Sequence, residues 1–311
     1  MDLGSLPAGA NLPWQRYGCD FGANAWQPGG GVAARDRQEQ LAPMLEAMAQ
    51  GGAQVVRWFL LGDGRAGLRL DAKGRAAGLD DHVYADMEAA LALASSYGLG
   101  VMFVLTDFLW FRRAEVVRGV RLFGKRGLVA KADRQAELLD RVFTPLLERF
   151  GSDSRVYAWD AFNEPEWAVL GLGTVDAQAA LLDTQMRAYL RELVERIRAT
   201  TRQRATVGLA GPRGLGLVRG LDLDFYQWHW YDTVEGVTPL AQPVAEHQVD
   251  RPVLLGEFPT RGSSRTPDVI HSVARAAGYG AAWPWSLLAE DEATDRAACL
   301  GAIVSGQAPR A

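Results

Sequence analysis

The sequence predicts an α/β protein built as a single (β/α)8 barrel of the TIM-barrel type. Eight short apolar, β-branched or aromatic runs recur along the 311 residues, and helical patterns separate most of them. This alternation is typical of a parallel sheet covered by helices. Eight such units fill one barrel domain of this length, so residues 1–311 are predicted to be one catalytic domain. Polar side chains also gather at several predicted strand ends, where such barrels place their active sites.

The predicted strands are bounded by turn residues, as buried strands usually are. In chain order they cover residues 17–23, 54–61, 100–108, 156–164, 204–211, 224–231, 252–258 and 279–288. The alternative architecture is a doubly wound open sheet, which binds dinucleotides through a glycine-rich turn after its first strand. The glycines of GANAWQPGGG lack the spacing of that fingerprint, so the barrel is favoured.

The helices between the strands are predicted from apolar residues at helical spacing and from capping residues at their ends. The predicted starts are Asp80 or Asp81, Asp133, Asp176 and Thr266-Pro267, and the predicted stops are Gly51, Gly98, Gly151 and Gly278. Pro43 leaves the start of the first helix open, because proline disrupts a helix interior. The helical signal is weaker in residues 215–220 and 239–248.

Composition excludes several classes of function. With 48% hydrophobic residues the chain can bury a sizeable core, and its net charge of -4 attracts neither nucleic acid nor an anionic membrane. No window approaches 18 consecutive apolar residues, so no membrane span is predicted. Cys19 and Cys299 form neither a disulfide framework nor a metal cluster. The N-terminal segment has no signal-peptide pattern, which predicts a cytoplasmic protein, or a secreted one if a leader has been removed.

Two glutamates lie at the ends of the fourth and seventh predicted strands. Glu164 follows Asn163 in AWDAFNEPEW, and Glu257 lies in LLGEFPT. Across a barrel mouth two such carboxylates can face a bound sugar, as glycosidic cleavage requires. One acid must keep its proton for the leaving oxygen, while the other stays ionised to attack the anomeric carbon. Asn163 is placed to hydrogen-bond the sugar hydroxyl next to that carbon. A single glutamate at a strand end is more often a solvated turn residue, so the hypothesis depends on the whole set.

Three further polar residues at strand ends fit this chemistry. Arg57, on the second strand, is placed to keep Glu257 ionised by charge pairing, and Tyr231 to donate a hydrogen bond to the same carboxylate. His229, two residues before Tyr231, is placed to orient Glu164. Together with Glu164 and Glu257, these three residues at predicted strand ends form a candidate active site.

The ten tryptophans support a carbohydrate ligand, because sugar rings present apolar C–H faces that pack on aromatic planes. The tryptophans predicted to bind substrate are Trp26, Trp167, Trp283 and Trp285. Trp159 and Trp228 lie inside strand patterns and are predicted to be core residues. Trp110 and Trp230 follow strand ends, and both interpretations stay open for them.

These motifs resemble those of clan A glycoside hydrolases and are most similar to glycoside hydrolase family 5, the cellulase and β-mannanase family, over nearly the whole barrel. The resemblance implies that Glu164, in its Asn-Glu-Pro segment, is the acid/base and that Glu257 is the nucleophile. It implies retention of configuration by double displacement, with no cofactor and no metal. Further matches to the family pattern are Arg57, His229, Tyr231 and Trp285. The chain departs from the pattern at Pro284, between Trp283 and Trp285.

The predicted function is retaining hydrolysis of β-linked hexose poly- or oligosaccharides of the β-1,4-mannan or β-glucan type. The alternatives are an exo-acting β-glucosidase or β-mannosidase and a carbohydrate-binding barrel without turnover. A metal-dependent hydrolase is disfavoured, because the four histidines form no ligand set.

Other charged residues are given structural roles. Asp160 is predicted to be a buried acid that supports the barrel. His82, His247 and His271 are predicted to lie on the surface. Residues 112–131 hold seven Lys or Arg against the single Glu115. Such a run is usually a solvated face, and the alternative is contact with an acidic or phosphorylated glycan.

Overall fold

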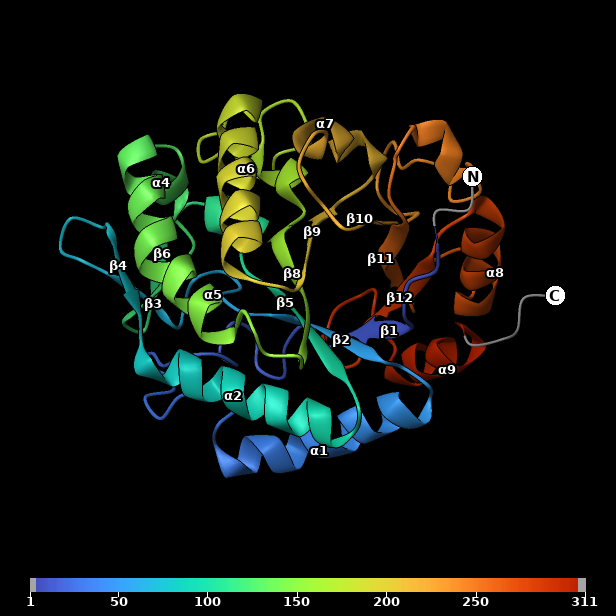
Figure 1. The fold of residues 1–311 in the computed structure, drawn as a ribbon, viewed down its shortest axis with the longest axis horizontal. Helices are drawn as coiled ribbons and strands as arrows, with labels where there is room; N and C mark the ends of the chain where they lie inside the picture. The colour runs from blue at the N-terminus through green and yellow to red at the C-terminus, as the bar shows by residue number, and fades with distance from the viewer. Residues whose placement is uncertain (1–3, 307–311) are drawn as a thin grey trace.

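The strands form a barrel surrounded by helices. The computed structural model describes residues 4–306. Eight parallel strands pair in the order β1-β2-β5-β8-β9-β10-β11-β12, and helices lie around them (Figure 1). The first and last strands of this order, β1 and β12, lie next to each other and close the barrel. Beside them the Leu287 amide donates to the Asn11 carbonyl (3.0 Å) and the Leu6 amide donates to the Gly280 carbonyl (3.2 Å). The predicted (β/α)8 fold is confirmed.

Most of the barrel strands are shorter than the apolar runs that predict them. Their bounds are β1 Gly9–Asn11, β2 Val55–Phe59, β5 Gly100–Val104, β8 Val156–Asn163, β9 Arg204–Leu209, β10 Tyr226–His229, β11 Val253–Pro259 and β12 Ala281–Trp285. Two antiparallel hairpins lie outside the barrel, β3 Leu68–Leu70 with β4 Ala76–Leu79, and β6 Glu115–Val117 with β7 Val120–Leu122. The second hairpin lies in the basic segment 112–131.

The first predicted strand, residues 17–23, is wrong. This segment is an irregular loop, and the first barrel strand is β1, which pairs with β2. Two glycines of the loop have positive φ, +63° at Gly18 and +94° at Gly22, which breaks an extended strand. The Asp20 carboxylate accepts hydrogen bonds from two backbone amides of residues 15–16. Buried apolar side chains such as Phe21 give the loop its strand-like sequence.

The helices cover the barrel from several sides (Figure 1). Their bounds are α1 Arg35–Gln50, α2 Asp81–Ser96, α3 Arg126–Val129, α4 Ala132–Leu138, α5 Thr144–Phe150, α6 Asp183–Thr200, α7 Leu215–Val218, α8 Pro267–Ala277 and α9 Arg296–Gly306. Short helical turns are η1 Phe108–Phe111, η2 Leu139–Phe143, η3 Pro165–Ala168, η4 Pro212–Gly214 and η5 Val244–His247. No helix within residues 4–306 is both long and apolar enough to traverse a lipid bilayer.

Capping residues predict some helix ends correctly. The Asp80 carboxylate accepts the Val83 amide and caps α2, and Gly278 ends α8 at φ 95°. Asp176 does not open a helix: its carboxylate accepts the backbone amides of Arg113 and Gln178, and α6 begins at Asp183. Helix α9 was not predicted.

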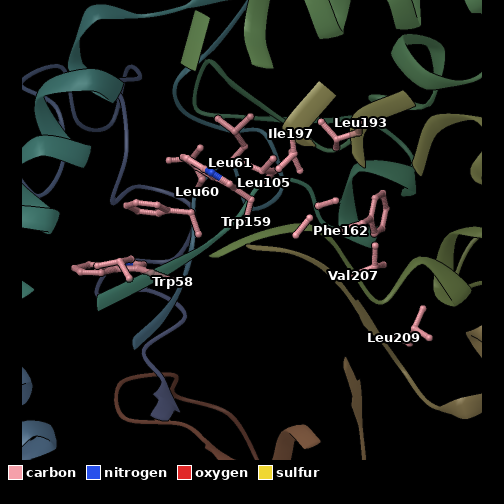
Figure 2. Close-up of a cluster of buried hydrophobic side chains, with 14 of the residues drawn as sticks. Trp58, Leu60, Leu61, Leu105, Trp159, Phe162, Leu193, Ile197, Val207 and Leu209 are labelled. Atoms are coloured by element: carbon pink, nitrogen blue, oxygen red, sulfur yellow. The ribbon is translucent and has the colours of Figure 1, made fainter. Parts of the chain in front are cut away.

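The main core lies between the strands and the surrounding helices. Figure 2 shows Trp58, Trp159 and Phe162 of the strands together with Leu193 and Ile197 of α6. The strand side chains of this group occupy outward positions, so their burial against helices holds the barrel in shape. Trp159 and Trp228 are core residues, as predicted from their places inside strands.

Candidate active site

Irregular strand pairing turns several polar side chains into the barrel. The register of β8 shifts between Asp160 and Asn163, and that of β11 shifts within residues 255–258, around Glu257. An extra residue in one strand re-aims the side chains that follow it. Asp160 and Asn163 stand three positions apart, and yet both accept hydrogen bonds from Arg57.

Arg57, in the middle of β2, is the centre of a buried polar network. Its Nε and Nη2 donate to Asp160 Oδ2 (3.0 and 2.9 Å), and Nη2 also donates to Asn163 Oδ1 (2.8 Å). Its Nη1 donates to Asn11 Oδ1 (3.1 Å) and to Glu257 Oε1 (2.5 Å). The side chain is completely buried, so these acceptors offset the loss of its hydration. The arginine thereby fixes Glu257 from below the cavity.

The two predicted glutamates meet at the top of this network. Glu257 Oε2 accepts the Tyr231 hydroxyl at 2.8 Å, and His229 Nδ1 lies 2.8 Å from Glu164 Oε1 and 3.5 Å from Glu257 Oε2. Trp167 Nε1 donates to Glu164 Oε2 at 2.9 Å. One oxygen of each glutamate lies within 4.8 Å of the other. Retaining glycosidases separate their carboxyl groups by about 5–5.5 Å, whereas inverting enzymes need about 6.5–9.5 Å.

The local backbone structure explains the Asn-Glu-Pro segment. Asn163 ends β8, Glu164 takes the left-handed conformation (φ 52°, ψ 56°), and Pro165 begins η3. The Glu164 amide is held by the Gly208 carbonyl of β9 at 2.6 Å. A non-glycine residue in this region costs about 1–3 kcal/mol, which the surrounding contacts must offset. The turn directs the Glu164 side chain across the barrel mouth.

Burial shifts the pKa of both glutamates and of the histidine between them. Desolvation raises the pKa of Glu164 to about 7, although Trp167 and Arg57 act in the opposite direction. Desolvation also raises the pKa of Glu257, although the Arg57 charge acts in the opposite direction. Desolvation lowers the pKa of His229 to about 4, so this ring is neutral at pH 7. Glu164 therefore keeps a proton near neutral pH, as a general acid requires.

A cavity of about 300 Å³ opens above these carboxylates. Predicted residues that line it are Asn163, Glu164, Trp167, Tyr231, Glu257 and Trp285. Arg57 and His229 lie almost wholly buried and do not line it. The Trp285 indole is held by Asp291 Oδ2 at 2.8 Å and meets Trp14 edge to face, with ring centroids 5.8 Å apart.

Several cavity residues were not predicted. They include Trp14, Tyr17, Phe59, Asp107, Phe108 and Asp291. Phe59 is the last residue of β2, and Asp107 follows β5, so their places at strand ends were a usable signal. Trp14 follows β1, and the misplaced first strand hid it. Asp107 Oδ2 accepts the Asn163 side-chain amide at 2.8 Å and so orients it.

Glu166, a buried glutamate two residues after Glu164, was also missed. Its carboxylate accepts the amides of Ala210 (2.9 Å) and Gly211 (3.2 Å), and burial raises its pKa to about 7. It holds the loop that carries Arg213, whose guanidinium lies 4.6 Å from the centre of the Trp167 ring. Glu166 therefore supports the site without lining the cavity.

Two residues that were predicted to bind substrate do not line this cavity, which is called the catalytic cavity below. Trp283 is wholly buried in a cluster with Val55, and its indole donates to the Pro7 carbonyl at 3.0 Å. It lies two residues before Trp285 and therefore deeper in the barrel. Trp26 is 39% exposed outside this cavity, and its indole donates to the Arg118 carbonyl at 3.3 Å.

Other expectations differ in outcome. Asp160 is a buried acid that holds the barrel interior together, as predicted. The prediction that His271 lies on the surface is wrong, because the residue is buried and meets the Phe258 ring at a centroid distance of 5.0 Å. Trp110 and Trp230, which the sequence left open, are buried core residues.

Glu164, His229 and Glu257 are also the group, within residues 4–306, whose donor atoms lie close enough to hold a metal ion. Each carboxylate oxygen already contacts a protein donor or ring nitrogen. The Arg57 guanidinium on Glu257 would repel a dication. The donor set fits proton transfer better than metal binding.

The chain is similar to several known glycoside hydrolases, although no family model matches it. It is 22% identical over 318 residues to mannan endo-1,4-beta-mannosidase of Mytilus edulis, covering 90% of this chain and 83% of that protein. The β-mannanase structure from Mytilus edulis has a TM-score of 0.78 at 19% identity, covering 96% of this chain and 91% of the other.

Two further structures extend the likeness. The endo-1,4-beta-mannanase of Eisenia fetida has a TM-score of 0.78 at 19% identity and covers 96% of this chain and 90% of its own. A glycoside hydrolase family 5 enzyme of Prevotella bryantii, in complex with a xyloglucan tetradecasaccharide, has a TM-score of 0.59 at 14% identity and covers 98% and 95%. The chain therefore shares the (β/α)8 barrel fold of these enzymes, and its strand-end residues resemble those of clan A glycoside hydrolases. Within that class the chain is similar to β-mannanases.

Proposed function

We propose that residues 1–311 are one catalytic domain, a retaining glycoside hydrolase that cleaves internal β-1,4 bonds of mannan. The observation that carries the proposal is the approach of Glu164 and Glu257 to within 4.8 Å at the mouth of the barrel. This spacing leaves room for direct attack by a carboxylate and too little for an interposed water. The named β-mannanases that the chain resembles support mannan as the substrate.

In the first step a Glu257 oxygen attacks the anomeric carbon, and Glu164 gives its proton to the leaving glycosidic oxygen. Arg57 and Tyr231 hold the Glu257 carboxylate in place for the attack. In the second step Glu164 takes a proton from water, the water oxygen bonds to the anomeric carbon, and Glu257 leaves. The two inversions together retain the configuration.

Asn163 is proposed to hydrogen-bond the hydroxyl next to the reacting carbon. Arg57 donates to its oxygen and Asp107 accepts from its nitrogen, each at 2.8 Å, which fixes the orientation of the amide. The side chain lines the cavity beside Glu164. A polar group held in advance stabilises the transition state without reorganisation.

Trp285 and Trp167 are proposed to bind the sugar rings. Both line the cavity, and each indole nitrogen is anchored by a carboxylate, Asp291 for Trp285 and Glu164 for Trp167. Anchored rings lose little freedom when a sugar packs against them.

Azide rescue tests the two roles separately. With a dinitrophenyl β-manno-oligosaccharide, Glu257→Ala in azide should yield the α-mannosyl azide, because azide replaces the nucleophile. Glu164→Ala should yield the β-mannosyl azide, because azide attacks the covalent intermediate. Glu166→Gln, a neighbouring buried glutamate, is the control and should show no rescue. If NMR shows that the wild type first releases the α-anomer, the enzyme inverts the anomeric configuration and the proposal fails.

Product sizes test the substrate and the mode of cleavage. Internal cleavage of mannan should release mixed oligosaccharides from the earliest time points. Release of mannose alone would identify an exo-acting β-mannosidase, and cleavage of β-glucan in place of mannan would overturn the substrate. Binding without any release of product would identify a carbohydrate-binding barrel.

A further inference from the structure

A second cavity of about 350 Å³ lies beside the catalytic cavity. The β2–β3 connection supplies Gly64 and Arg65, and Arg121 and Lys125 come from the basic segment 112–131 that contains the β6–β7 hairpin. Three of these four residues are basic, although the chain as a whole carries a net charge of -4. None of these residues takes part in the proposed hydrolysis.

The contacting side chains of Tyr17 and Arg65 lie between the two cavities. Tyr17 lines the catalytic cavity, and the Arg65 guanidinium, which lines the second cavity, lies 4.5 Å from the centre of the Tyr17 ring. The same guanidinium lies 5.5 Å from the centre of the Trp26 ring, which is partly exposed. A glycan in the catalytic cavity therefore has a neighbouring basic site within reach of its side groups.

The cations of this cavity differ in how they are balanced. Asp63 neutralises Arg65 through a two-pronged contact, with Nη2 to Oδ2 at 2.7 Å and Nε to Oδ1 at 2.9 Å. Neither Lys125 nor Arg121 has a carboxylate at ion-pair distance in the described part of the chain. The cavity thus keeps two cations without an ion-pair partner.

Lys125 is the more informative of the two. The residue is 2% exposed, and its ammonium, which has three donors, makes one hydrogen bond, to the Phe123 carbonyl at 2.8 Å. Desolvation, assisted by the Arg121 charge, lowers its pKa to about 8. The Asp63 charge acts in the opposite direction without forming an ion pair with Lys125. A buried cation without an ion-pair partner is costly, and an anion in the cavity would offset that cost.

The backbone is fitted closely to this lysine. Gly64 has φ +74°, and a Cβ there would stand 2.8 Å from the Lys125 Cε. Any larger residue would therefore displace the ammonium group from its place at the cavity wall. The lysine is held in position by the loop that separates the two cavities.

We propose that this second cavity is a subsite for an anionic group on the glycan, a carboxylate of a uronic acid or a sulfate ester, carried by the chain whose β-bond is cleaved. Arg121 and Lys125 bind the anion, and the partly exposed Trp26 ring offers a face to the sugar that bears it. This subsite rests on the proposed hydrolase function and names its preferred substrate class. It gives the basic segment and Trp26 a role at the edge of the catalytic site.

Three matched oligosaccharides test the subsite: a β-1,4-manno-oligosaccharide, the same chain with one glucuronic acid side group, and the same chain with one sulfate ester. The wild type should cleave at least one anionic chain with kcat/KM about tenfold above the neutral chain. This ratio should fall towards one as NaCl rises from about 10 mM to about 1 M, because salt screens the contact. The sugar that gives the larger ratio identifies the anion.

Arg121→Gln and Lys125→Met should each bring the ratio close to one. Arg191→Gln, which removes an equal charge from the exposed face of α6, should leave the ratio unchanged. Arg121 is exposed, so its variant keeps the test valid if the buried Lys125 variant does not fold. Equal kcat/KM for all three chains in the wild type, or an unchanged ratio in Arg121→Gln, would overturn the subsite. If no chain is cleaved, the hydrolase proposal fails, and calorimetric affinities for the same chains still decide the subsite.

Discussion

The inside of the barrel has two layers that differ in chemistry although the same strands build them. The lower layer is apolar and consists of Val55, Met102, Ala158, Phe225, Leu254 and Trp283. The upper layer is polar and consists of Arg57, Asp160, Asn163, Gln227, His229 and Glu257. On β2 and β8 the change takes one step along the inward face, from Val55 to Arg57 and from Ala158 to Asp160. Strands β2 and β8 thus supply packing below and chemistry above.

The two layers are held together by different forces. Apolar packing below depends on filled volume, so other side chains of similar size would serve. The polar groups above each have a specific partner, and removing one leaves another buried and unsatisfied. The lower layer therefore supports the fold, and the upper layer fixes the positions of groups that act on a ligand.

Replacing Arg57 should have the largest effect, because it removes the centre of the upper layer. Arg57→Met leaves Asp160 and Glu257 buried without their cation, and loss of one partner of a buried ion pair costs about 3–5 kcal/mol. Urea unfolding should show this loss, and activity should fall below detection. Arg57→Met combined with Asp160→Leu should recover part of the stability and none of the activity. Full activity in the single variant would contradict a central role for Arg57.

Trp283 and Trp285 give the sharpest comparison, because two residues of one strand lie in different layers. Trp283→Ala empties the lower layer and should cost about 3–5 kcal/mol of unfolding free energy, with kcat/KM of the folded protein nearly unchanged. Trp285→Ala should lower kcat/KM by about tenfold or more, because it removes a ring from the cavity. Unfolding curves and initial rates on mannan measure both effects. Equal loss of stability and activity in both variants would remove the distinction.

The sequence predicted the layers only in part. Glu164 and Glu257 could be found because strand ends and an Asn-Glu-Pro segment mark them. Alternation along a strand did not distinguish Trp283 from Trp285, because both point inward and differ in depth. The shifts of register that turn Asn163 and Glu257 inward depend on pairing with neighbouring strands, which a local pattern does not contain.

The first strand shows a second limit. Strand β1 is the short segment Gly9–Asn11 and contains no apolar run, whereas the loop of residues 17–23 buries Phe21 and resembles a strand. The misplaced strand also hid Asn11, which contacts Arg57, and the cavity residues Trp14 and Tyr17. Local composition reports burial, and burial alone does not separate a strand from a packed loop.

The pH dependence should report the raised pKa of Glu164. The acid must be protonated to act, so kcat/KM should fall tenfold per pH unit above about 7. At low pH the rate should fall as Glu257 takes up a proton. Because the pKa of Glu164 rises on folding from 4.5 to about 7, its contribution to stability is present below pH 4.5 and is lost as pH rises through about 7.

Glu166→Gln is the matched control for this pH profile. The pKa of Glu166 is also raised to about 7, by burial and by the charge of Glu164, and repulsion between two carboxylates acts on both of them. The alkaline limb of the profile is the fall of kcat/KM above about pH 7. If Glu164 is the acid, this limb should persist in the variant and move slightly to lower pH. Loss of the limb would show that it reports the titration of Glu166, and it would contradict the assignment of Glu164 as the acid.

Arg213→Met should have the smallest effect, because Arg213 packs on Trp167 and is not itself part of the upper layer. Its guanidinium lies 4.6 Å from the centre of the Trp167 ring, and its charge lowers the pKa of Glu164. Loss of the contact, worth about 0.5–1 kcal/mol at such a site, should raise KM for mannan by about two- to fivefold. The alkaline limb should move to higher pH, since a neighbouring cation no longer favours the ionised acid. A stability change without a shift of the limb would show that Arg213 acts on packing alone.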